Sequence, residues 1–270
     1  MWEYINADRY PLHDLDSVAA QVLVDKSRQI LEKDGVLELA DFLRPETVIE
    51  LVLEAGRLAS SGHRMEGEFS PYSDDMSETG NYDLTDNHPR NIKLPAAHRF
   101  VAGDLLPRQS PLRKIYASHT FLRFVCAVLN RGSLHRLADD MGALNYVIYE
   151  PGDDNGWHFD TTDFVLSIPL QSPEFGGEYQ YIRDLRSAHD ENLDQVRWRM
   201  EHPDDCKGVG TVQLRPGTLF FFKGRYTLHR VSRVLGNRNR MVAIISFHQS
   251  PGHRLSHSSK LAMYGRTAPG

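Results

Sequence analysis

The feature that most constrains the fold is a change of pattern near Leu144. Before it, hydrophobic residues recur at helical spacing in segments that begin near Ser17 and Pro45. After it, the chain is a series of short apolar segments separated by turn signals such as Pro216-Gly217 and Gly236-Asn237. Short strands that follow helices are typical of an α+β domain, and so many of them favour a jelly roll or barrel for the second half.

The expected elements can be placed by residue number. Strands are predicted over residues 144–149, 158–170, 178–182, 210–214, 219–223, 227–234 and 240–248. Helices are predicted over residues 17–33, from 45 to about 55 and over residues 110–130, with a short strand at 36–39.

The length of 270 residues suits a single domain. We expect a mainly helical part over residues 1–143, a β core over 144–250 and a C-terminal tail over 251–270. Residues 60–95 are rich in Gly, Ser, Asp, Asn and Pro, and so long a loop inside a compact domain is usually functional or mobile. We interpret it as a lid or substrate loop. A polar insertion over residues 187–205 is expected to be partly helical.

The composition argues against several classes of protein. A net charge of -5 and a pI near 6.2 provide no overall basic footprint for nucleic acid. No apolar run approaches the roughly 18 residues that a membrane span needs, and Met1–Leu12 lacks a signal-peptide core. The only cysteines, Cys126 and Cys206, indicate neither a disulfide framework nor a thiolate zinc site. A reducing cytoplasm is therefore the expected location.

His158 and Asp160 are the first candidate metal ligands. They precede the apolar run at 164–168, and on a strand residues i and i+2 project from the same face. A second H-x-D occurs at residues 202–204 and an H-x-E at 189–191. Both lie in or beside the polar insertion, where solvation disfavours a rigid pair of ligands. We therefore expect His158 and Asp160 to form the pair.

The third ligand should come from another strand that faces the same interior. His229 qualifies because its segment follows the very apolar run Leu219–Phe222. The histidines beyond it lie at a strand end or in the polar tail, at positions 248, 253 and 257. Two imidazoles and one carboxylate form the 2-His-1-carboxylate set, which leaves three coordination positions open on a non-haem iron.

Arg240 begins another apolar strand, Met241–Ile245. A buried, unpaired charge is costly, so an arginine there needs an anion. Arg238 lies in the turn, where solvent can satisfy it. Because a guanidinium can hold a carboxylate through two parallel hydrogen bonds, Arg240 is the candidate for binding a dicarboxylate cosubstrate.

These residues carry a resemblance to a known family. H-x-D at 158–160 is followed by P-G-T-L-F-F-F-K-G at 216–224, H-R-V at 229–231 and R-N-R-M at 238–241. In this order the motifs resemble those of the Fe(II)/2-oxoglutarate-dependent dioxygenases. The resemblance implies a double-stranded β-helix core, jelly-roll or cupin-like, with N-terminal and flanking helices. It also implies Fe(II) held by His158, Asp160 and His229, and 2-oxoglutarate held by Arg240.

A narrower resemblance extends over more of the chain. Four segments resemble the small halogenases and hydroxylases that act on free amino acids: Ile5-Asn6, Arg9–Pro11, Asp184–Ser187 and Tyr264–Ala268. Halogenases of this type have a small residue in place of the metal carboxylate, which leaves a position for chloride. Asp160 fills that position here, so hydroxylation is favoured. The implied reaction consumes O2 and 2-oxoglutarate, releases succinate and CO2, and hydroxylates an unactivated C–H bond of a small polar substrate.

Further assignments and alternatives remain open. Asn145 could hydrogen-bond the cosubstrate and Tyr146 or Tyr149 could reach it, although ordinary strand packing explains all three. Arg90 could hold a substrate carboxylate or be a plain surface arginine. The same cofactors also serve desaturation, epimerisation and cyclisation, and a cupin-like protein could bind a metal or small molecule without turnover. Arg240 argues against this last reading. The oligomeric state is not predicted.

Overall fold

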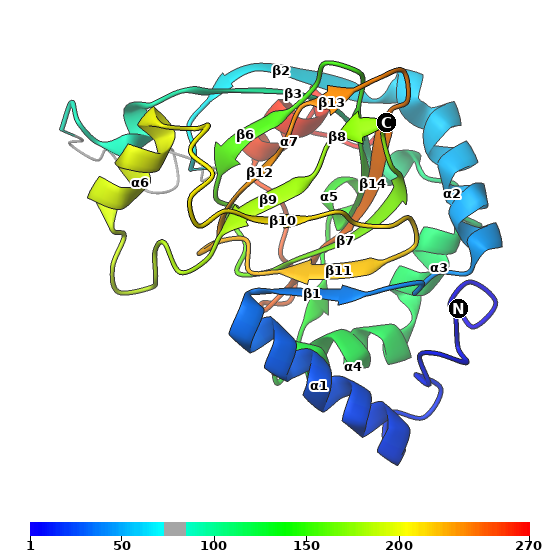
Figure 1. The fold of residues 1–270 in the computed structure, drawn as a ribbon. Helices are drawn as coiled ribbons and strands as arrows, with labels where there is room; N and C mark the ends of the chain where they lie inside the picture. Colours follow the sequence, from blue (N-terminus) through cyan, green and yellow to red (C-terminus); the bar gives the residue numbers. More distant parts are fainter. Residues whose placement is uncertain (73–84) are drawn as a thin grey trace.

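The computed structural model describes residues 1–72 and 85–270. Its centre is an eleven-stranded antiparallel sheet in the order β1-β11-β7-β14-β5-β3-β6-β12-β9-β10, with β2 paired to β3. The sheet curls so that its two ends face each other (Figure 1). The strands of this sheet are β1 (Val36–Leu39), β2 (His63–Phe69), β3 (Leu94–Ala102), β5 (Leu144–Tyr149), β6 (Asn155–His158), β7 (Val165–Gln171), β9 (Tyr179–Ile182), β10 (Gly210–Val212), β11 (Leu219–Phe222), β12 (Leu228–Val231) and β14 (Arg240–Ile245).

Two short pairs of strands lie outside this sheet. They are β13 (Val234–Leu235) with β8 (Phe175–Gly176), and β15 (Phe247–His248) with β4 (His135–Arg136). The predicted α+β class with a jelly-roll core is confirmed, because helices flank a curled antiparallel sheet (Figure 1).

Four helices, α1 (Val18–Asp34), α2 (Pro45–Leu58), α3 (Pro111–Ala117) and α4 (His119–Val128), cover the outer side of the sheet (Figure 1). Ser17 caps α1 by accepting a hydrogen bond from the Ala20 N–H, and Gly35 ends it at φ 72°. The helix predicted over 110–130 is two helices, because Ser118 ends α3 and caps α4 through the Phe121 N–H. The other helices are α5 (Asp140–Ala143), α6 (Leu193–Glu201) and α7 (His257–Tyr264).

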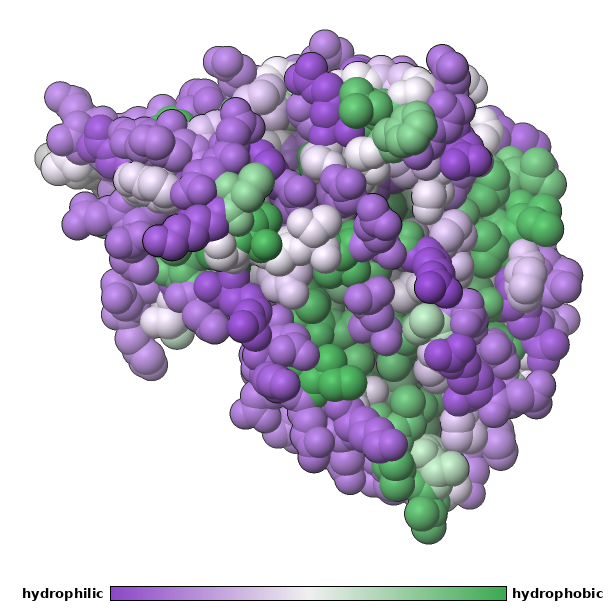
Figure 2. All heavy atoms as spheres, viewed as in Figure 1, coloured by the Kyte–Doolittle hydropathy of each residue, from purple (hydrophilic) through white to green (hydrophobic). Residues whose placement is uncertain are grey.

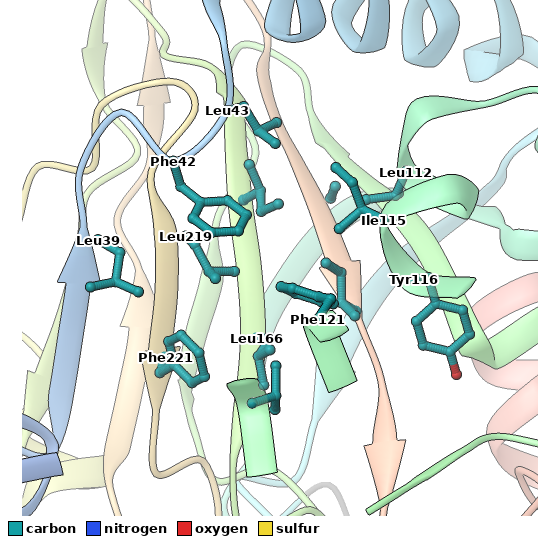
Figure 3. Packing of buried hydrophobic residues seen from close by; sticks show 14 of the residues in the cluster. Leu39, Phe42, Leu43, Leu112, Ile115, Tyr116, Phe121, Leu166, Leu219 and Phe221 are labelled. Atoms are coloured by element: carbon teal, nitrogen blue, oxygen red, sulfur yellow. The ribbon is translucent and has the colours of Figure 1, made fainter. Parts of the chain in front are cut away.

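The main core lies between these helices and the outer face of the sheet. Figure 3 shows Phe121 of α4 and Ile115 of α3 packed toward Leu166 and Leu219 of the sheet. Alternation along the strands sends the other side chains inward, so Met241, Ala243 and Ile245 face the helices while Arg240, Val242 and Ile244 face the interior of the curl. Each large apolar side chain buried in such a core contributes about 1.5–3 kcal/mol.

Several boundaries differ from the sequence expectation. The loop predicted over 60–95 contains β2, and its residues 73–84 lie outside the described part of the chain. The predicted strand 158–170 is divided between the end of β6 and β7. The polar tail contains α7, which Ser256 caps. The partly helical insertion is confirmed as α6.

The outer surface is mostly polar. Figure 2 shows hydrophilic side chains over most of one face, with hydrophobic ones visible near its centre and along its right side, as is usual for folded domains. In the described parts of the chain, none of the helices combines the length and apolar character that crossing a bilayer requires.

Candidate metal centre

His158, Asp160 and His229 converge inside the curl of the sheet. One candidate ligand atom from each lies within 4.8 Å of the others, and no other group of this kind occurs among the described residues. Nε2 of His229 is 3.3 Å from Oδ2 of Asp160, and Nε2 of His158 is 3.8 Å from Oδ1. The two imidazole rings are 4.2 Å apart between centroids. Three donors are therefore aimed at one small volume.

Strand pairing brings the two histidines together. His158 ends β6 and is the direct register partner of His229 on the antiparallel strand β12. Residues directly opposite each other on such a pair project from the same face of the sheet. Asp160 follows just beyond the end of β6, where its N–H donates to the Gly224 carbonyl at 3.1 Å.

The backbone selects one tautomer of each imidazole. Nδ1 of His158 lies 2.7 Å from the carbonyl oxygen of Gly156, and Nδ1 of His229 lies 2.9 Å from that of Thr227. A carbonyl oxygen only accepts, so Nδ1 carries the proton in both rings. The Nε2 lone pairs are left for a metal, which is the usual way in which neighbouring groups orient histidine ligands.

The electrostatics favour the protonation states that bind a cation. Burial and the neighbouring His229 lower the pKa of His158 to about 4. Burial acts to raise the pKa of Asp160, but His229 and His158 outweigh it and hold the pKa below its ordinary value. Neutral imidazole and ionised carboxylate are the states that a metal requires.

Arg240 lies on the adjacent wall of the interior, at the start of β14 and opposite Tyr149 of β5. Its side chain is buried, its Nε donates to the Gly177 carbonyl at 2.9 Å, and its guanidinium carbon is 5.1 Å from the centre of the Tyr149 ring. Burial lowers its pKa, and among the described residues no carboxylate pairs with it. It lines a pocket of about 370 Å³. An unpaired guanidinium in such a pocket fits an anionic ligand.

Tyr179 is a functional candidate that the sequence reasoning missed. Its ring stacks on His229 with centroids 5.5 Å apart, and it lines the same pocket as Arg240. Its hydroxyl is buried and has no hydrogen-bond partner in the described residues. Burial raises the pKa of Tyr179 well above its ordinary value, so the group stays a donor. Arg240 and Tyr179 together offer the donors that a carboxylate would use. The one sequence signal that pointed to Tyr179 was the turn at Gly176-Gly177 just before it.

Asn145 and Tyr146, both candidates on β5, point to opposite faces of the sheet. Tyr146 points to the helical side and donates to Glu54 at 2.6 Å, so it does not reach the pocket. Asn145 faces the interior, but its register partner is Ile244, which lies four residues along β14 from Arg240, the partner of Tyr149. Its buried Oδ1 lacks a hydrogen-bond partner in the described chain, and its carboxamide lies next to Tyr264. A role for Asn145 in binding the cosubstrate stays a prediction.

Arg90 lies in the short 3-10 turn η2 (Pro89–Asn91) outside the curl. Its guanidinium carbon is 4.2 Å from the centre of the Tyr72 ring, and that ring is 5.5 Å from Phe159. Phe159 stands between the two ligands His158 and Asp160 in sequence. Arg90 is therefore connected to the segment of His158 and Asp160 through two aromatic rings tilted by 42°, and its role in substrate binding stays a prediction.

The alternative pairs in the polar insertion do not form a comparable group. His189 and His202 are both exposed, and the His202 ring stacks on Trp198 at 4.7 Å. Neither belongs to a cluster of metal-ligating side chains in the described residues. The structure brings His158 and Asp160 together with His229, and their role as metal ligands stays a prediction.

Comparison with known protein families gives a match over nearly the whole chain, from residue 19 to residue 265, to the family described as Halogenase D. The chain belongs to the Halogenase D family. This confirms the resemblance to Fe(II)/2-oxoglutarate oxygenases of the halogenase and hydroxylase type that the motifs predicted, and it confirms that the chain is an enzyme. No curated protein matches this Halogenase D member.

Solved structures similar to this Halogenase D member share its fold. A 2OG-Fe(II) oxygenase family oxidoreductase from Burkholderia pseudomallei superimposes with a TM-score of 0.54 at 12% identity, over 85% of this chain and 92% of that one. A prolyl-4-hydroxylase from Pseudomonas putida has a TM-score of 0.51 at 14% identity, over 84% and 99%. HygX from Streptomyces hygroscopicus, solved with nickel, 2-oxoglutarate and hygromycin B, has a TM-score of 0.54 at 14% identity, over 84% and 87%.

The residues present fit the cofactors that the Halogenase D family member was expected to use. Two imidazoles and one carboxylate form the donor set of a non-haem iron site. The buried Arg240 guanidinium and the unpartnered Tyr179 hydroxyl form an anion subsite beside them. Iron and a dicarboxylate such as 2-oxoglutarate match this combination.

Proposed function

We propose that this protein is an Fe(II)/2-oxoglutarate-dependent oxygenase that hydroxylates an unactivated C–H bond of a free amino acid or similar small polar molecule. Succinate and CO2 are the coproducts. The observation that carries the proposal is the convergence of His158, Asp160 and His229 beside the pocket of Arg240. Membership of the Halogenase D family supports it.

Each residue of the site has a defined task in this proposal. His158, Asp160 and His229 hold the iron, while Arg240 and Tyr179 hold the distal carboxylate of 2-oxoglutarate. The iron supplies the activation of O2, coupled to oxidative decarboxylation of 2-oxoglutarate. The protein orients the donors and excludes water, since Tyr179 and Phe222 pack against His229 with ring centroids 5.5 and 5.1 Å away.

Asp160 decides between the two outcomes that the family resemblance allows. A halide ligand needs the position that a small residue would leave open, and here the carboxylate of Asp160 takes that place, with Oδ2 3.3 Å from Nε2 of His229. We therefore propose hydroxylation, with chloride having no part in the reaction.

The proposed substrate follows from the narrower resemblance and from Arg90. A guanidinium next to the metal strand is suited to the carboxylate of an amino acid. Substitution R90A should raise the KM for the amino acid more than the KM for 2-oxoglutarate, whereas R108A, at an exposed arginine elsewhere, should change neither. Equal KM values for R90A and the native enzyme would remove Arg90 from the substrate site.

The deciding experiment is anaerobic reconstitution with Fe(II) and 2-oxoglutarate, followed by exposure to air with a panel of free amino acids. The proposal expects succinate release that depends on one substrate and a product heavier by one oxygen, even in chloride buffer. Loss of two hydrogens would indicate desaturation or ring formation, and an unchanged mass would indicate epimerisation. The absence of O2 uptake with every substrate would favour a binding protein instead.

The proposed location is the cytoplasm. Both cysteines, Cys126 and Cys206, are free thiols in the structure, as is usual in a reducing compartment. Small molecules and O2 are the proposed partners.

A further inference from the structure

Gly224 lies directly against the carboxylate of Asp160. A Cβ atom built on Gly224 would lie 2.4 Å from Oδ2 of Asp160, 2.8 Å from its Cβ and 3.0 Å from its Cγ. These three atoms are its nearest neighbours, and two of the distances are shorter than any real Cβ contact. A side chain at position 224 would therefore compete with the Asp160 carboxylate for the same space.

The backbone conformation is not what requires a glycine here. Gly224 is absent from the glycines with positive φ, unlike Gly176 and Gly177. Alanine at position 224 would consequently carry no penalty for a left-handed conformation. Its cost would come from the contact with Asp160.

The turn that contains Gly224 also fixes the backbone around both ligands. The Gly224 carbonyl accepts from the Asp160 N–H at 3.1 Å. Arg225 donates through Nε to Oδ1 of Asp163 at 2.9 Å and through a terminal nitrogen to the Thr161 carbonyl. Residues 223–227 thus hold the segment that carries Asp160, and the same turn leads directly into β12 and His229.

We infer that Gly224 is a positioning residue of the metal centre, which leaves free the volume that the Asp160 carboxylate needs and fixes its backbone. The inference rests on the proposed function in one respect, because it takes Asp160 as a metal ligand. A methyl group at position 224 would turn the carboxylate away from the Nε2 atoms of His158 and His229. Metal affinity would fall while the histidines stayed in place.

Metal binding by the protein alone tests this inference without any turnover. The metal-free protein is titrated with Co(II), followed by its visible absorption, in the absence of 2-oxoglutarate and substrate. Substitution G224A should weaken Co(II) binding by about tenfold or more, the range seen when a group that orients a ligand is lost. The matched control is G142A in α5, whose Cβ would lie 2.4 Å from Cδ1 of Leu255 and would meet none of the candidate ligands within 4 Å among its three nearest atoms. It should destabilise the protein and leave its Co(II) affinity unchanged.

A second pair of variants tests the contact itself. Substitution D160G removes all three atoms that a Cβ at position 224 would meet. G224A should therefore lower the free energy of unfolding of the metal-free native protein but not that of D160G, a coupling that only neighbouring positions show. If G224A alone does not fold, a folded D160G/G224A double variant supports the inference, and an unfolded one overturns it.

The outcomes separate the inference from the proposed function. Equal Co(II) affinities for G224A and the native protein, or equal effects of G224A in both backgrounds, would overturn the role of Gly224. If the native protein itself binds no Co(II) at these ligands, the proposed function fails, and a stability coupling between positions 224 and 160 would then show a packing contact alone.

Discussion

Nε2 of His229 lies 3.3 Å from Oδ2 of Asp160, although the two residues belong to segments that are far apart in the chain. The contact places the Asp160 carboxylate, whose pKa stays below its ordinary value despite burial because of His229 and His158, beside an imidazole whose Nδ1 faces the Thr227 carbonyl at 2.9 Å. Nε2 of His229 and the Asp160 oxygens are therefore the atoms that can hold a third species. A divalent cation is the species that this geometry accepts.

Substitution D160A should abolish hydroxylation. Loss of a direct ligand should weaken metal binding by more than the roughly 10- to 100-fold that loss of an orienting partner costs. The other H-x-D provides a matched control, since D204A removes an exposed carboxylate at the same spacing from a histidine. Substrate-dependent succinate release measures both variants. Full activity in D160A would show that the metal is held elsewhere.

Substitution R240M should weaken binding of 2-oxoglutarate by about 2 kcal/mol or more, roughly 30-fold, because the carboxylate loses a buried charged partner. The metal-free protein should remain at least as stable, since a buried cation without a described carboxylate partner is replaced by an apolar side chain. R238M is the control, because Arg238 is exposed and its side chain donates, within the described residues, to the carbonyls of Ser172 and Pro173 alone. Isothermal titration with 2-oxoglutarate and urea unfolding separate the two effects. If R240M lowered the free energy of unfolding but bound 2-oxoglutarate with the native affinity, the role of Arg240 would be structural.

Substitution Y179F tests the hydroxyl that lines the same pocket. Removing one neutral donor should raise the KM for 2-oxoglutarate about fivefold, equivalent to about 1 kcal/mol, with kcat nearly unchanged. Y181F, on the same strand and stacked at 5.8 Å, should behave like the native enzyme. Similar KM values for Y179F and Y181F would rule out a hydrogen bond from Tyr179.

The metal-free protein should lose stability as the pH falls. Burial lowers the pKa of His98 to about 3, whereas an unfolded histidine titrates near 6.5. Between these two pH values His98 is therefore protonated in the unfolded chain and neutral in the folded protein. The stabilisation is complete above about pH 6.5 and decreases by about 1.4 kcal/mol per pH unit below it, until about pH 3.

Substitution H98F keeps a ring between Phe100 and Tyr149, whose centroids are 4.8 and 5.1 Å away. Between pH 7.5 and 5.0, measured by urea unfolding with a chelator present, it should lose about 2 kcal/mol less than the native protein. His158 is present in both proteins, so the difference reports His98 together with its coulombic interaction with His158. H202A, at an exposed histidine, should follow the native pH dependence. An unchanged slope in H98F would mean that His98 is protonated in the fold.

The candidate ligands could be predicted because their signals are local. His158 and Asp160 share a strand-like context, and His229 and Arg240 introduce apolar strands, whereas the competing H-x-D is surrounded by charge. Pairing of His158 with His229 could not be predicted, because strand register depends on contacts across the whole sheet.

Other features left weak or ambiguous signals. Strand β2 has charged side chains at alternate positions (Arg64, Glu66 and Glu68) and is mostly exposed, so it depends on its pairing with β3. Tyr179 resembles any core aromatic in sequence, since only the fold shows its hydroxyl without a partner. Gly224 resembles an ordinary turn glycine until the Asp160 carboxylate is placed beside it.

A bound metal would also support the pairing of β6 with β12. Each strand is only four residues long, and the ladder is irregular just past His229. Few hydrogen bonds join two strands this short, and a metal bound by His158 and His229 would cross-link them. We expect the metal-free protein to open more readily between these two strands. Limited proteolysis should therefore be faster without metal than with it.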